Sequence, residues 1–178
     1  MSLESDRIKK DGGIFLIGMP GVGKSTVGVI LAKQLGRDFI DADLVIQRRE
    51  NKLLPEIIEE KGIDGFLEIE NEVCRDLAGS AAGAVVATGG SAVYGTEAME
   101  RMKENGTVVY LEASLRVLRR RLRNLKGRGV VLREGQTLKE LYRERTVLYE
   151  RFADITVKED GRSVEETLDA VMEALRRG

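Results

Sequence analysis

The strongest constraint on the fold of this chain is the segment 18–25, which reads GMPGVGKS. It matches the pattern G-x-x-x-x-G-K-[ST] at every fixed position. The apolar run before it predicts a strand over Ile14–Ile17, and the periodic pattern after it predicts a helix over Lys24–Leu35. A strand, a glycine-rich loop and a helix in this order let backbone N–H groups turn toward phosphate oxygens at the helix N-terminus.

This loop predicts a binding site for a nucleoside triphosphate and its magnesium ion. Lys24 is expected to reach the outer phosphates, and the Ser25 hydroxyl is expected to contact Mg²⁺. A GTPase would also be expected to carry an N-K-x-D motif for guanine, but residues 51–54 read NKLL. The residues expected to hold the nucleotide are Gly18, Gly21, Val22, Gly23, Lys24, Ser25 and Thr26.

Short β-like runs alternate with amphipathic helical runs along the chain, which predicts a doubly wound α/β fold with a parallel sheet and helices on both faces. No internal repeat or low-complexity linker interrupts the pattern, so residues 1–178 are expected to form one domain. The predicted strands are Ile14–Ile17, Asp38–Ile40, Ala84–Ala87, Thr107–Leu111 and Ile155–Val157. The predicted helices are Lys24–Leu35, Leu44–Glu50, Asp64–Ala78, Thr96–Lys103, Ser114–Leu125, Leu138–Phe152 and Val164–Arg177.

Two segments stand outside this alternation. Residues 1–12 are mostly polar and charged, and they are predicted to be a flexible N-terminal extension. Residues 126–136 carry three glycines and two arginines between two predicted helices. Such a segment is either a lid that moves over a bound ligand or an ordinary surface loop.

Composition argues against several function classes. The 29 Lys and Arg residues are balanced by 30 Asp and Glu residues, which argues against nucleic-acid binding through bulk charge. There is no histidine, so acid–base chemistry must rest on carboxylates or lysines. The single cysteine, Cys74, cannot form an internal disulfide, which favours the reducing cytoplasm. The uncharged stretch Leu77–Thr96 has too few large apolar side chains to span a membrane, and we expect a monomer without a membrane partner.

Asp41 and Asp43 follow the second predicted strand. Ligands of parallel sheets bind beyond the carboxyl ends of the strands, so this pair is expected to face the same crevice as the phosphate loop. On an extended segment two aspartates one residue apart point the same way. One of them can then hold magnesium while the other meets an acceptor hydroxyl. Alternatively, Asp43 is the N-cap of the helix that starts at Leu44.

Together these motifs resemble those of the shikimate kinase family: the phosphate loop, the Asp-x-Asp sequence at 41–43 and a Gly-Gly turn at 89–90 after the third strand. The resemblance runs from Ile14 to about Arg177. It implies a three-layer P-loop NTPase fold, a five-stranded parallel sheet of order 2-3-1-4-5 and a lid. It also implies ATP and Mg²⁺ as cofactors, and transfer of the γ-phosphoryl group to a hydroxyl of a small metabolite, as in the conversion of shikimate to shikimate 3-phosphate.

The resemblance also implies roles for single residues at the reacting phosphate. Ser25 and Asp41 would bind the metal ion. Asp43 would orient the hydroxyl to be phosphorylated and would therefore be catalytic. Lys24 and Arg128, an arginine of the lid segment, would act on the phosphoryl group as it is transferred. These roles are expectations that follow from matching positions in the family pattern.

Further roles concern the acceptor and the nucleotide base. Gly89 and Gly90 would bring backbone close to the acceptor, beside Asp43. Arg145, in the sequence ERTVLY, would bind an acceptor carboxylate. Arg121 would lie next to the adenine ring. The resemblance thus implies an acceptor site assembled from three separate parts of the chain.

The chain departs from the family pattern at three positions. Leu67 stands where the family has an arginine that binds the acceptor carboxylate, Ser91 replaces the third glycine of the turn, and Gly129 replaces the proline after the lid arginine. Losing a charged bidentate contact is expected to weaken carboxylate binding by roughly 2–4 kcal/mol. Glu70 would lose its arginine partner, and it would then repel a carboxylate and favour an amine or a hydroxyl. We therefore also consider an acceptor other than shikimate.

Two alternatives remain open at the level of sequence. The chain could be a kinase of another small metabolite on the same scaffold, such as a nucleotide or a gluconate-type acid. A nucleoside monophosphate kinase would be expected to carry more arginines around its acceptor. The chain could instead be a nucleotide-binding regulatory module whose acceptor site has decayed. Retention of the full set of phosphoryl-transfer residues argues against that second alternative.

Overall fold

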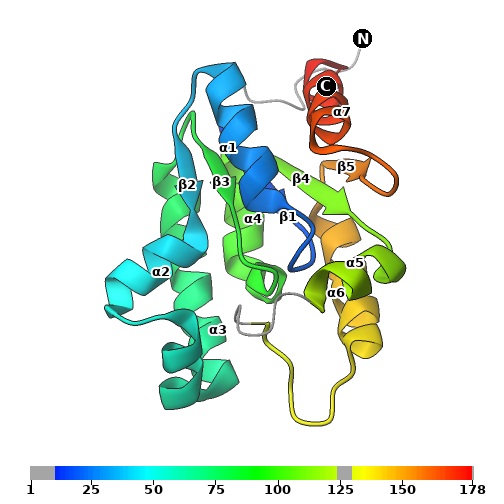
Figure 1. The fold of residues 1–178 in the computed structure, drawn as a ribbon. Coiled ribbons are helices and arrows are strands. Elements are labelled where there is room, and N and C mark those ends of the chain that lie inside the picture. Colours follow the sequence, from blue (N-terminus) through cyan, green and yellow to red (C-terminus); the bar gives the residue numbers. More distant parts are fainter. Residues whose placement is uncertain (1–10, 124–129, 178) are drawn as a thin grey trace.

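The computed structural model describes residues 11–123 and 130–177. Five parallel strands form one sheet with the order β2-β3-β1-β4-β5 (Figure 1), as the resemblance implies. The predicted strand positions are confirmed and differ from the observed ones only at their ends. The observed strands are β1 (Gly13–Ile17), β2 (Phe39–Asp41), β3 (Val85–Ala87), β4 (Gly106–Glu112) and β5 (Ile155–Lys158).

Helices cover both faces of this sheet, which gives a three-layer architecture (Figure 1). Helices α1 and α7 contact each other on one face, while α3 and α6 both contact α4 on the other. The helices are α1 (Lys24–Leu35), α2 (Ala42–Glu50), α3 (Leu54–Ser80), α4 (Thr96–Asn105), α5 (Leu115–Leu122), α6 (Leu138–Phe152) and α7 (Val164–Arg177), with a short 3₁₀ turn, η1 (Ala92–Tyr94).

Helix α3 is much longer than predicted, because the prediction began at Asp64 and the helix begins at Leu54. Gly62 has φ 71° and ψ 175°, so the helix is broken into two arms at this residue. The first arm starts where the Glu56 carboxylate accepts a hydrogen bond from the Leu53 N–H at 2.7 Å, next to Pro55. The sequence pattern did not predict the first arm, which contains a proline near its start and a glycine at its end.

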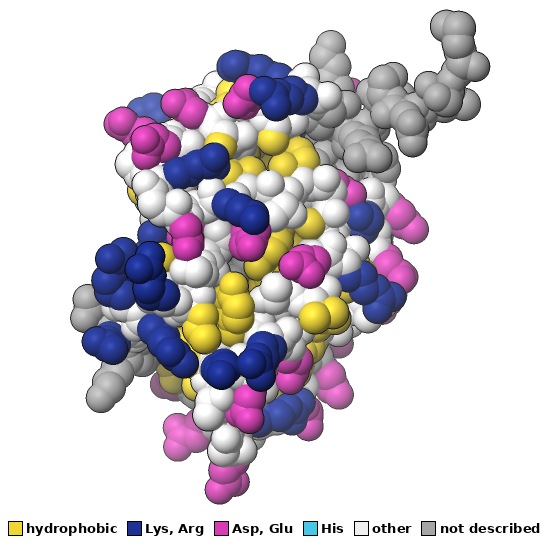
Figure 2. Space-filling view, turned by 90° about the vertical axis from the view of Figure 1, so that its right-hand side faces the viewer, with side chains coloured by type: hydrophobic (Ala, Val, Ile, Leu, Met, Phe, Trp, Pro, Cys, Tyr) yellow, Lys and Arg dark blue, Asp and Glu magenta, His cyan; other side chains and the backbone are white. Residues whose placement is uncertain are grey.

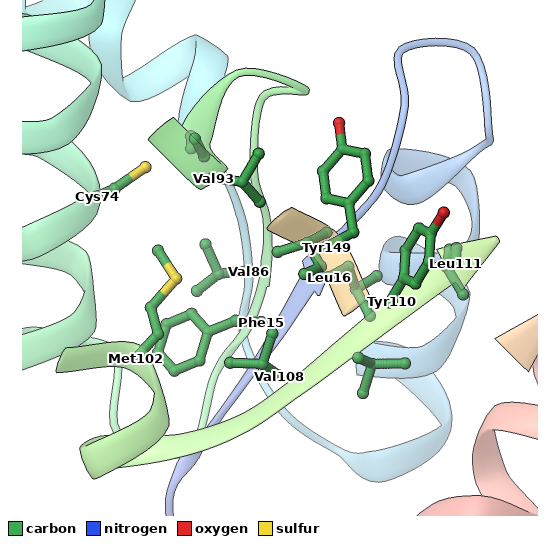
Figure 3. Close-up of a cluster of buried hydrophobic side chains, with 14 of the residues drawn as sticks. Phe15, Leu16, Cys74, Val86, Val93, Met102, Val108, Tyr110, Leu111 and Tyr149 are labelled. Carbon is green, nitrogen blue, oxygen red and sulfur yellow. The ribbon is translucent and has the colours of Figure 1, made fainter. Parts of the chain in front are cut away.

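The core lies between the sheet and its helices. Near-continuous apolar side chains of β1, β3 and β4 are buried, as parallel strands covered on both faces require. Figure 3 shows Phe15, Val86 and Val108 from these strands gathered with Met102 from α4. The Tyr110 ring stacks on another tyrosine ring, Tyr149 of α6, with 5.0 Å between centroids, and so ties this helix to the sheet.

The surface carries both signs of charge. Figure 2 shows Lys and Arg side chains interspersed with Asp and Glu over the face in view. Within the described residues no helix is both long and apolar enough to cross a membrane. The carboxyl ends of the neighbouring strands β2, β3 and β1 lie at one edge of the sheet. Ligands of open parallel sheets bind at this edge.

Candidate active site

The phosphate loop connects β1 to α1, as predicted. Gly23 is the N-cap of α1 and adopts a left-handed conformation with φ 101°, which glycine adopts without strain. A Cβ atom on Gly18 would lie 2.6 Å from the carbonyl oxygen of Leu111, so the loop can only approach β4 with glycine there. The first turn of α1 has no acidic residue and no side-chain cap. Its backbone N–H groups are therefore suited to an anion.

Lys24 lies at the start of α1 with its side chain buried. Its Nζ donates hydrogen bonds to the carbonyl oxygens of Gly18 at 2.7 Å and Met19 at 3.0 Å. Burial lowers the pKa of Lys24 to about 8, and the nearby Asp43 carboxylate acts in the opposite direction. A phosphate group would add further negative charge and would favour the protonated form. The ammonium group is therefore held where the loop curls around a bound anion.

Asp41 ends β2 and links it to the phosphate loop. One carboxylate oxygen accepts a hydrogen bond from the Ser25 hydroxyl at 2.8 Å. The other accepts from the N–H groups of Asp43 at 3.0 Å and Leu44 at 3.4 Å, so Asp41 is the N-cap of α2. The expectation that Asp43 caps this helix is therefore wrong. The expectation of a fully extended Asp-x-Asp segment is also wrong, because α2 begins at Ala42.

The Ser25 hydroxyl and the Asp41 carboxylate fit a magnesium ion that also contacts phosphate oxygens. Mg²⁺ in nucleotide sites takes one or two protein oxygens and completes its shell with phosphate oxygens and water. Among the described residues no three His, Cys, Asp or Glu side chains are grouped so that they could hold a metal ion by themselves. The pair thus fits Mg²⁺ bound together with a nucleotide better than a metal site made by protein alone.

Asp43 lies in the first turn of α2 and is partly buried at the rim of the same cavity. Burial raises the pKa of the Asp43 carboxyl, the neighbouring Asp41 raises it further, and Lys24 lowers it. A carboxyl group with a raised pKa accepts a proton more readily than an ordinary surface aspartate. Asp43 therefore combines a position beside the phosphate loop with the chemistry of a proton acceptor.

The turn after β3, residues 88–91, lines the same cavity and is called the acceptor wall below. The Thr88 hydroxyl donates to the Leu16 carbonyl at 2.9 Å and fixes the turn against the end of β1. A Cβ atom on Gly90 would lie 2.6 Å from Cδ of Pro20, within the phosphate loop. One on Gly89 would lie 2.3 Å from Glu70 Oε1 and 3.0 Å from Asp43 Oδ1. Only glycine allows these side chains and the turn to come so close.

Arg145 projects from α6 and is fully buried. It donates to the Val131 carbonyl at 3.1 Å, and its guanidinium lies over the Tyr94 ring, 5.3 Å from the centroid. Its Nη1 would lie 3.0 Å from a Cβ atom on Gly90, so this charge adjoins the glycine turn. The structure thus brings the predicted arginine of α6 to the turn that is predicted to meet the acceptor.

Glu70 of α3 is a buried carboxyl in the same cavity. The Ser91 hydroxyl donates to Oε2 at 2.5 Å, while Oε1 is buried without a hydrogen-bond partner. Burial raises the pKa of Glu70 to about 7, against a lowering by the Ser91 hydrogen bond. The replacement of the family's third glycine by Ser91 therefore adds a partner for this carboxyl.

One predicted residue, Arg121, stands apart from this cluster. Arg121 donates to the carbonyls of Gly21 at 3.3 Å and Val22 at 3.2 Å, and also pairs with Glu159. It thus supports the phosphate loop, and its role beside adenine stays a prediction. Arg128 and its neighbour Gly129 lie outside the described residues, so their predicted positions in a lid are untested.

One cavity of about 200 Å³ joins the phosphate loop to the acceptor wall. Leu67 does not line it; this side chain lines a second cavity together with Tyr94 and Val131. The lining of the first cavity consists of Pro20, Gly21, Gly23, Lys24, Ser25, Thr26, Asp43, Leu54, Phe66, Glu70, Thr88, Gly89, Gly90, Ser91, Leu122 and Val130.

Sequence reasoning missed the two tyrosines that support the acceptor wall. The Tyr149 hydroxyl donates to the Gly90 carbonyl at 2.6 Å, and Arg145 Nε–H donates to the Tyr94 hydroxyl oxygen at 3.4 Å. Tyr149 could have been found, because it follows Arg145 by four residues on a predicted helix and therefore lies on the same face. Tyr94 gave no such signal, since its place depends on η1.

Comparisons with known proteins agree with this geometry. The model of the shikimate kinase family matches residues 20–176. The shikimate kinase of Persephonella marina is 35% identical over 92% of this chain and 98% of its own length. The structure of a shikimate kinase from Acinetobacter baumannii in complex with shikimate superposes with a TM-score of 0.84, at 32% identity and with 93% of each chain covered.

The same agreement extends to a second solved structure. The shikimate kinase of Aquifex aeolicus superposes with a TM-score of 0.80 and 35% identity, covering 92% of this chain and 96% of that one. The family match includes the phosphate loop from Pro20 onward, the two aspartates, the glycine turn and Arg145. The chain therefore belongs to the shikimate kinase family and is a P-loop kinase that uses ATP and Mg²⁺ to phosphorylate a small molecule.

Proposed function

We propose that this kinase transfers the γ-phosphoryl group of Mg·ATP to a ring hydroxyl of shikimate or of a closely similar hydroxylated acid. The observation that carries the proposal is the single cavity in which the phosphate loop faces Asp43 and the Gly89-Gly90 turn. The names of the relatives support shikimate as the first acceptor to test, since one of their structures contains it.

At the nucleotide end, the N–H groups of the loop would hold the β- and γ-phosphates, with Lys24 adding a positive charge. Residues 18–26 would form this cradle. Ser25 and Asp41 would hold Mg²⁺, which neutralises charge on the phosphates when bound. We propose that Arg121 lies near the adenine ring and that Arg128, outside the described residues, acts on the transferred group from the lid.

At the acceptor end, Asp43 would accept a hydrogen bond from the reacting hydroxyl and take its proton. The hydroxyl oxygen then forms the new bond to the γ-phosphorus as the bond to the leaving ADP oxygen breaks. Gly89 and Gly90 would let the acceptor approach the backbone, and Arg145 would face its carboxylate. Positioning and charge neutralisation supply most of the rate in such a transfer.

A coupled assay of ADP release from Mg·ATP with shikimate tests this proposal. We expect turnover that depends on both shikimate and Mg²⁺, with the product identified by mass as a phosphate ester. ATP binding without ADP release on shikimate, polyols, sugar acids or nucleoside monophosphates would contradict it, and would favour a nucleotide-binding regulatory module.

Leu67 favours a second candidate, a kinase of a different small hydroxylated acceptor. Arg145 lies next to the glycine turn, while Leu67 lines another cavity and so brings no second cation to it. The variant Leu67→Arg tests this reading. A lower KM for shikimate would indicate that the rest of the acceptor site fits shikimate, which argues against the second candidate. An unchanged KM would indicate that other residues of the acceptor site also differ from the family, which favours it.

We infer that the enzyme works as a monomer in the cytoplasm, without a membrane or nucleic-acid partner. Its near-neutral net charge of −1 and its lone cysteine, which is buried, support this inference. Sedimentation of the purified chain at several concentrations tests the monomer. A mass that rises to twice 19.7 kDa with concentration would contradict it.

A further inference from the structure

Arg121 and Glu159 form an ion pair beside the phosphate loop. Glu159 directly follows β5, is only 5% exposed, and donates its N–H to the carbonyl of Glu112, at the end of β4, at 2.9 Å. Arg121, in the last turn of α5, donates from Nη1 to Glu159 Oε1 at 2.5 Å. Figure 1 shows α5 next to the loop between β1 and α1. The ends of two strands therefore fix the carboxylate, and the carboxylate fixes the arginine.

The same nitrogen of Arg121 contacts two carbonyl groups of the phosphate loop. Nη1 lies 3.3 Å from the Gly21 oxygen and 3.2 Å from the Val22 oxygen. In a planar trans peptide the N–H of the following residue points opposite to the carbonyl. The Val22 N–H accordingly points away from Arg121, and it donates to the Met19 carbonyl at 3.2 Å. The Gly23 N–H, opposite the Val22 carbonyl, also points away from Arg121.

A glycine on each side of Val22 makes these two peptide groups easy to rotate. Gly21 has φ 81° and Gly23 has φ 101°, and glycine has more backbone freedom than any other residue. Contact with a fixed cation restricts that freedom before a nucleotide binds. A site whose donors are already oriented binds more tightly, because less ordering is needed on binding.

We propose that Glu159 is a positioning residue for the nucleotide phosphates. It holds Arg121 against the carbonyls of Gly21 and Val22. That contact aims the Gly23 N–H at the phosphates. The inference rests on the proposed function of the phosphate loop as the cradle for Mg·ATP, and it holds whichever acceptor is phosphorylated.

The charge of Glu159 distinguishes this role from a direct electrostatic one. Its carboxylate is separated from the loop carbonyls by the guanidinium of Arg121 alone. A negative charge this close repels a polyphosphate. If Glu159 acted only through its charge, removing that charge would strengthen polyphosphate binding. If Glu159 positions Arg121, the same change weakens it.

The test measures binding directly, without an acceptor. The ligands are Mg·ADP and magnesium tripolyphosphate, a chain of phosphates without a base, and calorimetry gives the dissociation constant of each. The proteins are the unsubstituted chain, Glu159→Gln, Arg121→Gln and the variant that carries both substitutions. Glu165→Gln and Arg120→Gln, at exposed positions, are the matched controls.

In Glu159→Gln we expect both ligands to bind about 5- to 20-fold more weakly, because both depend on the loop. Arg121→Gln should weaken tripolyphosphate binding at least as much. The double variant should bind tripolyphosphate no more weakly than Arg121→Gln, since Glu159 acts only through Arg121. In steady-state assays of Glu159→Gln the KM for ATP should rise while the acceptor KM stays unchanged. Both controls should match the unsubstituted chain.

Unchanged or stronger tripolyphosphate binding in Glu159→Gln would overturn the inference. A loss confined to Mg·ADP would also overturn it, because the pair would then serve the base and not the loop. Additive losses in the double variant would do the same, since they would show that Glu159 acts independently of Arg121.

Should Glu159→Gln fail to fold, Arg121→Gln decides in its place. Unchanged tripolyphosphate binding in that variant would overturn the inference, because the contact with the loop would then orient nothing. These binding results leave the proposed function intact. The proposed function fails instead if the unsubstituted chain releases no ADP with shikimate or a similar acid.

Discussion

The two ends of the active-site cavity are built in different ways. The nucleotide end is one continuous stretch, residues 18–26, whose backbone N–H groups and single lysine are fixed by a strand, a tight loop and a helix. The acceptor end is assembled from β2 with α2, α3, the turn after β3 and α6. A site of consecutive residues is set by local geometry, whereas a site of scattered side chains depends on how the helices pack.

The two ends also differ in charge. The nucleotide end presents an ammonium group and helix N–H groups, which suit an anion. The acceptor end presents two carboxyls with raised pKa values, Asp43 and Glu70, beside the buried Arg145. This contrast suits transfer of an anionic group to a molecule rich in hydroxyls, and the predictions below test it from the strongest effect to the weakest.

Lys24→Ala should have the largest effect because it removes the ammonium group that lies within the phosphate loop. We expect turnover to fall on the order of 10³-fold or more, since that charge stabilises the phosphoryl group during transfer. Steady-state ADP release measures it, with Lys33→Ala on the exposed side of α1 as the control. A Lys24→Ala enzyme that keeps most of its activity would contradict the assignment.

Asp43→Asn should impair catalysis at the acceptor end without weakening nucleotide binding at the other end. The amide keeps the shape but cannot take a proton, so we expect kcat to fall on the order of 10²–10³-fold while nucleotide affinity is preserved. Stopped assays give kcat, and calorimetry with Mg·ADP gives the dissociation constant. If kcat is unchanged, Asp43 has no catalytic role; if nucleotide binding is lost as well, the two ends are not independent.

Glu70→Gln should change how stability depends on pH. The folded-state pKa of Glu70 is about 7, above its ordinary value of 4.5, because burial outweighs the Ser91 hydrogen bond and the charges of Arg145 and Lys24, while Asp43 raises it further. Between these pH values the folded chain keeps a proton that the unfolded chain has lost. The free energy of unfolding therefore falls as pH rises through this range.

The variant should lack that decline. Near pH 5 the two proteins should have similar stability, and at pH 8 Glu70→Gln should be more stable by about 3 kcal/mol. Urea unfolding at a series of pH values measures this difference. A gap between the two proteins that is the same at pH 5 and pH 8 would show that Glu70 is not protonated by burial.

Tyr149→Phe should have the smallest effect of the four. It removes the hydrogen bond from the Tyr149 hydroxyl to the Gly90 carbonyl but leaves the ring stacked on Tyr110. We expect a loss of about 1 kcal/mol in stability and a modest rise in acceptor KM, with nucleotide affinity unchanged. An altered nucleotide affinity would show that the acceptor wall and the phosphate loop are coupled through Pro20, which Gly90 contacts closely.

The sequence by itself determined the sheet, its helices and the phosphate end of the site. The apolar runs of buried parallel strands can be recognised in the sequence alone. The glycines at 18, 21 and 23 indicate the positive φ angles that the phosphate loop requires. The resemblance supplied the strand order. The first arm of α3 was not predicted, and it contains Pro55 near its start and Gly62 at its end, two residue types with low helix propensity.

The resemblance named Asp43, the glycine turn and Arg145, but only the tertiary structure decided which contacts hold the acceptor end together. It assigned the N-cap of α2 to Asp41, placed Tyr149 under Gly90 and joined Ser91 to Glu70. These contacts link residues on separate elements, and their distances depend on helix packing that no local pattern encodes. A free oxygen on a buried carboxyl is visible only once every neighbour is in place, because hydrogen-bond satisfaction is a property of the folded chain and not of any segment.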